Sequence, residues 1–207
     1  MPTELIGRAI EDIVEAYALL TGHGRITASR PSSDVDHKDF IIDERGGYRS
    51  VYLQVKGVTQ LNALGQIRMQ VVFRETEVLS SPRFLYLFVF LDPKTVSIRR
   101  MYLIPSPDFN RMAPRAKARP GYVVLPFVDG ITSRRSKWDR FLIQPEELGA
   151  KLFDAMEAAK DAAAISRPIT AFLLMQASRR SSANSANRSK RTTRAGHDRR
   201  LNIKNAA

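Results

Sequence analysis

The feature that most limits how this chain can fold is an unbroken apolar run from Phe84 to Leu91. It is far shorter than the roughly 18 apolar residues that a membrane-spanning helix needs. A strand that is apolar at every position is buried on both faces, as central strands of α/β sheets are. The run therefore predicts a central strand in a sheet that other elements cover on each side.

Helix and strand patterns alternate around this run. Apolar residues at helical spacing predict helices over Glu4–Leu20 and Pro145–Ala164. The proline-rich, basic stretch Pro105–Gly121 is expected to be a surface loop. This order predicts an α/β or α+β domain around a mixed sheet. Further strands are expected over Arg25–Arg30, Asp39–Asp43, Ser50–Val58, Ile67–Phe73, Ser97–Ile104 and Tyr122–Val128, the last of them at a sheet edge.

Composition excludes several classes of protein. The chain has no cysteine, so disulfides, thiolate zinc sites and cysteine nucleophiles are excluded, and its three histidines are too scattered for a zinc site. The sequence contains no Walker-type phosphate loop, no dinucleotide fingerprint and no Gly-x-Ser-x-Gly elbow. We expect a cytoplasmic protein without a membrane partner, since no secretory signal is visible at the N-terminus.

The net charge of +12 is concentrated at the C-terminal end. Residues 177–207 contain nine Lys or Arg and one Asp, giving +8, whereas the rest has 24 basic and 20 acidic residues, giving +4. This segment has almost no apolar residues, so we expect a disordered basic tail after a globular domain over residues 1–176. Such a tail binds polyanions without sequence preference, DNA or RNA first and an acidic membrane second, although a solubilising or vestigial extension stays open. The residues expected to contact nucleic acid are Arg179, Arg180, Lys190 and Arg191 in the tail and Arg111, Arg115, Lys117 and Arg119 in the loop.

Two neighbouring strands carry polar residues that can act together. Side chains alternate between the faces of a strand, so Gln54 and Lys56 point to one face while Leu53 and Val55 point to the other. Asp39 begins the preceding strand. An antiparallel hairpin would bring this carboxylate close to the amide and the ammonium.

The first helix can add a second carboxylate, Glu11, if it packs against this sheet. Carboxylate and amide oxygens are ligands that Mg²⁺ accepts, and a bound cation neutralises phosphate charge and makes a water more acidic. We therefore expect Asp39, Glu11 and Gln54 to bind Mg²⁺ or Mn²⁺. Lys56 would hold or activate the attacking group.

The segments Gly7–Glu11, Asp39–Ile42 and Leu53–Gly57 together resemble the PD-(D/E)xK nuclease superfamily. They look most like the branch with glutamine in place of the second acid, as in Mrr-type endonucleases. The resemblance implies a restriction endonuclease-like αβββαβ core and Mg²⁺-dependent cleavage of DNA. It also implies active-site positions for Glu11, Asp39, Gln54 and Lys56.

Three functions stay open from the sequence. The first is a Mg²⁺-dependent DNA endonuclease. The second is a non-catalytic module on the same fold that binds nucleic acid or protein, which the uncharged Gln54 suggests. The third is an unrelated α/β protein in which Asp39 is a turn residue and Lys56 a strand-end lysine. Asp36 is the alternative to Asp39 as a ligand. The cleavage sequence, the pathway and the oligomeric state, including a homodimer, stay open.

Overall fold

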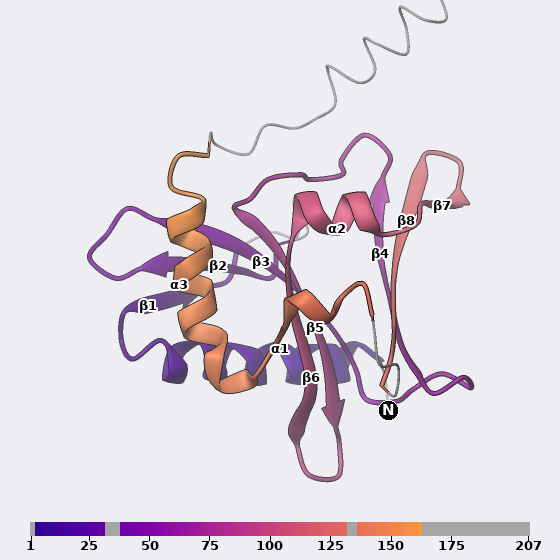
Figure 1. The fold of residues 1–207 in the computed structure, drawn as a ribbon, viewed down its shortest axis with the longest axis horizontal. Coiled ribbons are helices and arrows are strands. Elements are labelled where there is room, and N and C mark those ends of the chain that lie inside the picture. Colours follow the sequence, from indigo (N-terminus) through magenta and orange to yellow (C-terminus); the bar gives the residue numbers. More distant parts are fainter. Residues whose placement is uncertain (1–2, 32–37, 132–135, 163–207) are drawn as a thin grey trace, which may run out of the picture. The chain divides into compact units, whose positions relative to one another are not determined.

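The computed structural model of the chain describes residues 3–31, 38–131 and 136–162. The basic tail expected over residues 177–207 lies outside the described residues, as do the alternative ligand Asp36 and the four tail candidates Arg179, Arg180, Lys190 and Arg191. Within the described ranges the elements are α1 (Thr3–Thr21), β1 (Ile26–Ser29), β2 (Phe40–Glu44), β3 (Ser50–Val58), β4 (Gln66–Arg74), β5 (Phe84–Asp92), β6 (Ser97–Pro105), α2 (Ser106–Met112), β7 (Ala116–Arg119), β8 (Tyr122–Gly130), β9 (Leu142–Ile143) and α3 (Leu148–Ala158) (Figure 1).

The fold is α/β, built on a six-stranded mixed sheet with the strand order β1-β2-β3-β5-β6-β9. Strands β3 and β5 are parallel, and the other neighbouring pairs are antiparallel. The run Phe84–Leu91 lies in β5, between β3 and β6, so the predicted central strand is confirmed. The predicted antiparallel hairpin is β2 with β3, with Phe40 opposite Leu53.

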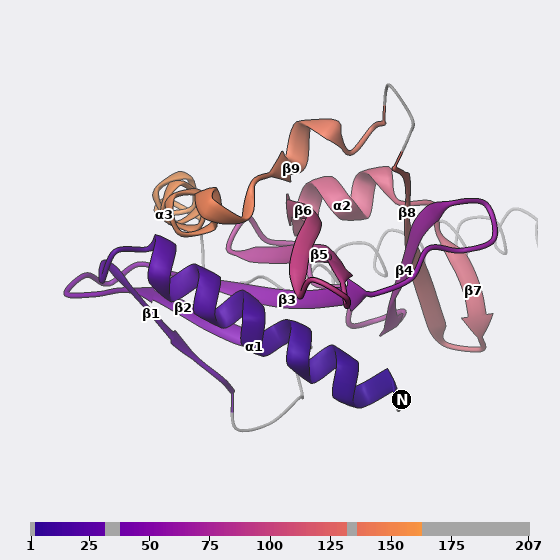
Figure 2. The same cartoon turned by 90° about the horizontal axis from the view of Figure 1, so that it is seen from below.

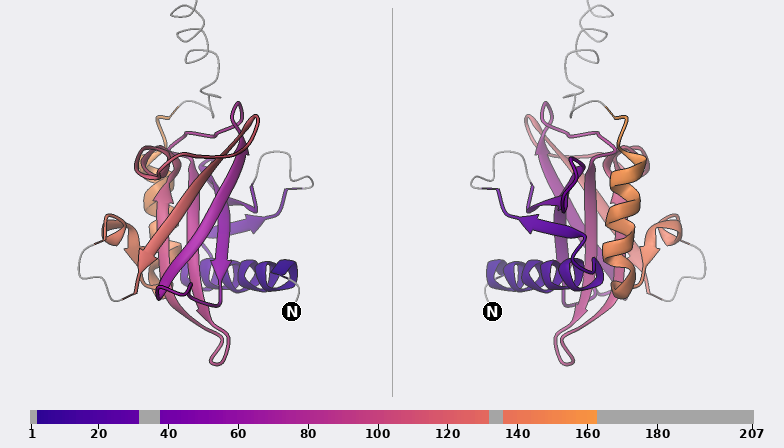
Figure 3. Two further views of the ribbon diagram at one scale, coloured as in Figure 1. Left: turned by 90° about the vertical axis from the view of Figure 1, so that its right-hand side faces the viewer. Right: turned by 90° about the vertical axis from the view of Figure 1, so that its left-hand side faces the viewer.

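Both faces of the main sheet are covered, as the apolar run requires. Helices α1 and α3 cover one face, and a second sheet of order β4-β8-β7 covers the other together with α2 (Figures 2 and 3). Side chains of β5 alternate between these two cores: Leu85 and Leu87 pack on the helix side, whereas Tyr86 and Phe88 pack on the side of the second sheet. The aromatic side also contains Trp138, which is fully buried.

The second sheet was not expected, and two predictions about its region are wrong. Pro105–Gly121 is not a loop, because it contains α2 and β7. Short α2 starts with a proline in its first turn and is held by Phe109, which is fully buried in the aromatic core. Strand β8 is not at an edge, since β4 and β7 pair with it on either side. Strand β4 is distant from β8 in sequence, whereas β7 joins β8 through a short hairpin that the proline and arginine content of this stretch did not reveal.

One connection and the length of one helix differ from the expected pattern. The parallel pair β3 and β5 is joined through β4 of the second sheet, whereas the family pattern places a helix there. The second long helix is shorter than predicted, because Pro145–Glu147 form a 3₁₀ turn and α3 ends at Ala158.

None of the helices in the described part of the chain is long and apolar enough to cross a membrane.

Candidate active site

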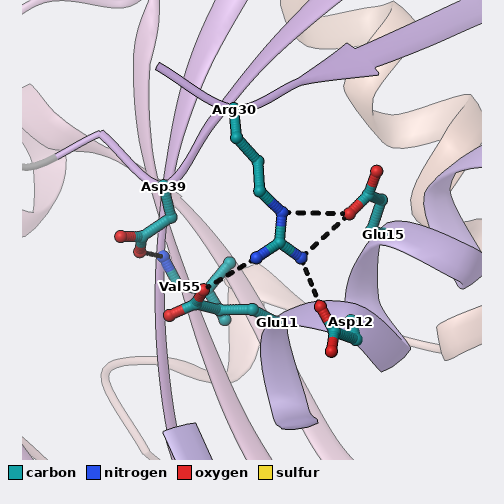
Figure 4. Close-up of polar contacts among 6 residues, drawn as sticks. All are labelled: Glu11, Asp12, Glu15, Arg30, Asp39 and Val55. Atoms are coloured by element: carbon teal, nitrogen blue, oxygen red, sulfur yellow. Dashed lines mark hydrogen bonds and ion pairs between the residues drawn. The ribbon is translucent and has the colours of Figure 1, made fainter. Parts of the chain in front are cut away.

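The carboxylate of Asp39 lies where β2 separates from β3. The backbone N–H of Asp39 donates to the carbonyl of Leu53 at 2.9 Å. The N–H of Val55 donates in turn to Oδ2 of Asp39 at 2.6 Å (Figure 4). The side-chain carboxylate of Asp39 thus accepts a backbone hydrogen bond of β3 that a carbonyl of a paired strand would otherwise accept. Strand β3 continues to Val58 beyond the end of its pairing with β2, and no strand among the described residues pairs with it on that side there.

Helix α1 approaches this edge closely, because β3 carries a glycine beneath it. A Cβ atom built on Gly57 would lie 2.5 Å from Cδ1 of Ile10, so a larger residue would push the helix away. Ile10 is buried in the core under the helix. The next residue, Glu11, is only partly buried, with 28% of its side chain exposed. Close packing of α1 therefore brings the carboxylate of Glu11 to the edge of β3.

The charges of Asp39 and Lys56 both act on Glu11. The pKa of Glu11 is raised above its usual value, first by burial and next by the negative charge of Asp39. Arg30 and Lys56 oppose this rise because their positive charges favour the ionised carboxylate. The structure therefore brings Glu11, Asp39 and Lys56 together around one short stretch of β3.

Gln54 is related to this group by its position in the strand. Continuing the β2–β3 register one residue beyond Phe40 sets Asp39 opposite Gln54. Gln54 is 3% exposed, and its Oε1 atom has no hydrogen-bond partner among the described residues. Leaving a buried amide oxygen unpaired costs about 1–3 kcal/mol. The hydroxyl of Tyr86 and Oδ1 of Asn110 are unpaired in the same way, so Gln54 leaves an acceptor for a water or a ligand and does not by itself select one.

Arg30 is part of the site, and the sequence did not reveal it. Its guanidinium extends from the end of β1 into an acidic stripe on α1 (Figure 4). It pairs with Glu15 at 3.0 Å, with Glu11 at 3.6 Å and also with Asp12. The acidic stripe on α1 can be recognised in the sequence, since Glu11 and Glu15 are one helical turn apart. Nothing local indicates that Arg30 is the partner.

The donor groups can be compared with what a cation requires. No group of three or more Asp, Glu, His or Cys side chains among the described residues could enclose a metal ion. Two carboxylates, Glu11 and Asp39, are present with the unpaired amide oxygen of Gln54. Mg²⁺ and Mn²⁺ suit this set, because Mg²⁺ is commonly held by one or two carboxylates with waters and substrate phosphates. A zinc or closed calcium site would need more ligands.

Three of the four basic candidates of the predicted loop lie on a helix or a strand. Arg111 is on α2, where it pairs with Asp108. Arg119 ends β7, with its guanidinium 3.8 Å from the centre of the Tyr122 ring. Arg115 is exposed between these two elements, and Lys117 lies within β7.

Comparison with known proteins gives little further guidance. No protein-family model matches the chain, and no curated protein matches it. Among solved structures, a bacterial homing endonuclease is similar with a TM-score of 0.45 and 11% sequence identity. The alignment covers 78% of this chain and 98% of that one. A likeness this distant supports no conclusion about the activity of this chain.

The raised pKa of Glu11 gives a prediction about stability. Folding favours protonated Glu11, so its contribution is fully present below the unfolded pKa and is lost as pH rises through the folded pKa. Glu11→Gln avoids this loss. We expect the variant to gain stability relative to the wild type between about pH 4 and pH 7. The gain should be below about 1 kcal/mol, because water screens a partly exposed charge.

Thermal unfolding of the wild type and of Glu11→Gln at about pH 4 and about pH 7, without added metal, measures this difference in stability. Asp154→Asn is a matched control, since Asp154 is exposed on α3 and its pairing with Lys151 at 3.7 Å is a surface contact. A Glu11→Gln protein that is less stable than the wild type by the same amount at both pH values would contradict the prediction.

Proposed function

We propose that this chain is a metal-dependent DNA endonuclease that hydrolyses phosphodiester bonds. The observation that carries the proposal is that Asp39 accepts a hydrogen bond from the Val55 N–H of β3, while the charges of Asp39 and Lys56 both act on Glu11. Two carboxylates and an ammonium near one stretch of a strand can supply the metal ligands and the positive group that metal-dependent phosphodiester hydrolysis uses. The unpaired oxygen of Gln54 supports it, because a buried acceptor without a partner suits a ligand site.

Each residue has a proposed role. Asp39 and Glu11 would bind Mg²⁺ or Mn²⁺, with Oε1 of Gln54 as an uncharged third ligand. When bound, the cation supplies positive charge for the phosphate and makes a water more acidic. The ammonium of Lys56 would orient the attacking water or stabilise charge that develops on the phosphoryl oxygens. Arg30 favours the ionised form of Glu11, which is the form that binds a cation.

The test is cleavage of supercoiled plasmid DNA by purified protein. We expect nicking with Mg²⁺ or Mn²⁺ and none with EDTA. Lys56→Ala should abolish nicking without unfolding the protein, since Lys56 lies at the sheet edge and is only partly buried. Lys151→Ala, an exposed lysine on α3, is the matched control and should cleave normally. Equal nicking by the wild type and Lys56→Ala would point to contamination or to another site.

One observation favours a second candidate, a non-catalytic DNA-binding module on the same fold. The site has two carboxylates and an uncharged glutamine, so it attracts a cation less strongly than three acids would. Isothermal titration calorimetry separates the two functions. Binding of DNA without any binding of Mg²⁺ or Mn²⁺ would favour the module.

A further inference from the structure

The outward face of the second sheet has an unusual composition. Burial alternates along β4, where Ile67, Met69, Val71 and Phe73 pack inward. Strands β4 and β8 pair in register, so that Arg68 lies beside Val128 and Arg74 beside Tyr122. We call the resulting surface the arginine face. Its residues are Arg68, Gln70, Val72 and Arg74 on β4, Tyr122, Val124, Pro126 and Val128 on β8, and Arg119 on β7.

This face is cationic and partly apolar. None of its residues is acidic, and Arg68 has no ion pair within the part of the chain that the structure describes, whereas Arg74 pairs with Glu77 at 3.6 Å just beyond the end of β4. Val72 and Val128 are 43% and 36% exposed; Val72 lies two residues from Arg74, and Val128 pairs with Arg68. A face kept only for solubility would mix both signs of charge and hide its valines. Exposed arginine, glutamine and valine together are typical of a binding surface.

One of the arginines is held in place by an aromatic ring. The guanidinium of Arg119 lies over the Tyr122 ring, 3.8 Å from its centre. Arg74 lies opposite the same tyrosine in the register of the neighbouring strand. A guanidinium fixed in this way loses less conformational entropy when it binds a ligand.

The dimensions of this face suit a DNA duplex. Strands β4 and β8 are nine residues each, which corresponds to a length of about 30 Å. That length spans roughly nine base pairs. Antiparallel strands fit the major groove, which is roughly 12 Å wide. In that groove arginine recognises guanine, glutamine recognises adenine and apolar groups contact the thymine methyl.

We propose that the arginine face reads base sequence in the major groove of double-stranded DNA. Arg68, Gln70 and Arg74 contact base edges, Val72 contacts thymine methyl groups, and Arg119 binds a phosphate. The inference rests on the proposed function, since it assigns the sequence specificity of that nuclease. It places DNA recognition on the second sheet, separate from the carboxylates that would bind the metal ion for cleavage.

The experiment uses the full-length Lys56→Ala protein, so that DNA is bound and not cut. Binding sites are selected from a random duplex library with excess competitor DNA. We expect a preferred sequence. Arg68→Gln and Gln70→Ala should each change the preferred base at one or two positions and weaken binding to the original site by about tenfold. Binding to unrelated DNA should change much less.

The double variant Arg99→Gln, Arg140→Gln is the matched control. It removes two exposed arginines that lie outside the arginine face, with 57% and 56% of their side chains exposed. It should leave the preferred sequence unchanged. An unchanged preference in both Arg68→Gln and Gln70→Ala, or no preference in the parent, would overturn the inference.

Two further outcomes separate this inference from the proposed function and from another occupant. If the wild type cleaves no DNA but the preference changes as expected, the nuclease proposal fails and the reading face is supported. Sedimentation tests whether a second copy of the chain covers the face. A dimer that dissociates on Val72→Glu, with DNA preference unchanged in that variant, would overturn DNA reading.

Discussion

Asp39→Asn is expected to reduce Mg²⁺-dependent DNA cleavage by at least about a thousandfold, corresponding to about 4 kcal/mol of transition-state stabilisation. The carboxylate of Asp39 accepts a hydrogen bond from the Val55 N–H and also supplies charge for a cation. An asparagine oxygen keeps the acceptor and removes the charge. The variant therefore separates the structural role from the proposed catalytic one. Thermal unfolding measures the structural role, and single-turnover cleavage at saturating enzyme measures the catalytic one.

Asp43→Asn is the matched control, because Asp43 lies in the same strand and pairs in register with Ser50. It should cleave within about twofold of the wild type, as substitutions away from a site usually change little. Asp39→Asn protein that cleaves at the wild-type rate would remove Asp39 from the mechanism. If that variant loses both its fold and its cleavage, the role of Asp39 is structural.

The elements that the sequence predicted well are those with a local periodic signal. Helix α1 and strands β3 and β5 lie within a residue or two of their predicted ranges, because each has a continuous apolar pattern of its own. The wholly apolar run of β5 also predicted that both faces of the sheet are covered. It did not say what covers them.

The second sheet escaped prediction because its signals are long-range. Strand β8 pairs with β4, and the paired residues lie 48 to 64 positions apart in the chain. Helix α2 is held by Phe109 packing against Tyr86 and Trp138, and none of these contacts is visible in a local window. Proline and arginine in this stretch indicated a loop, whereas burial of one phenylalanine outweighs their weak local preferences.

The candidate site was predictable in part. Alternation along β3 placed Lys56 on one face, and the acid at the start of β2 suggested Asp39. The helical position of Glu11 suggested that it would join them, and the structure brings all three together. Arg30 was missed because its carboxylate partners are distant along the chain. The catalytic roles of these residues stay predictions.

Gln54→Leu should have opposite effects on stability and on activity. The side chains are similar in volume, and the substitution removes a buried amide oxygen that has no partner among the described residues. The free energy of unfolding without metal should rise by about 1–3 kcal/mol, since that unpaired group no longer needs desolvation. Cleavage should fall, because leucine cannot bind a cation. Urea unfolding with EDTA and cleavage with Mg²⁺ measure the two effects.

The signs of the two effects distinguish the explanations for a glutamine at this position. A glutamine kept only for packing would give Gln54→Leu protein with equal or greater stability and unchanged cleavage. A glutamine with a hydrogen-bonded structural role would give a less stable protein. Gln60→Leu, at an exposed glutamine just after β3, is the control and should change stability by less than about 0.5 kcal/mol. Only a ligand position predicts greater stability together with lost cleavage, since functional sites retain groups that the fold alone would exclude.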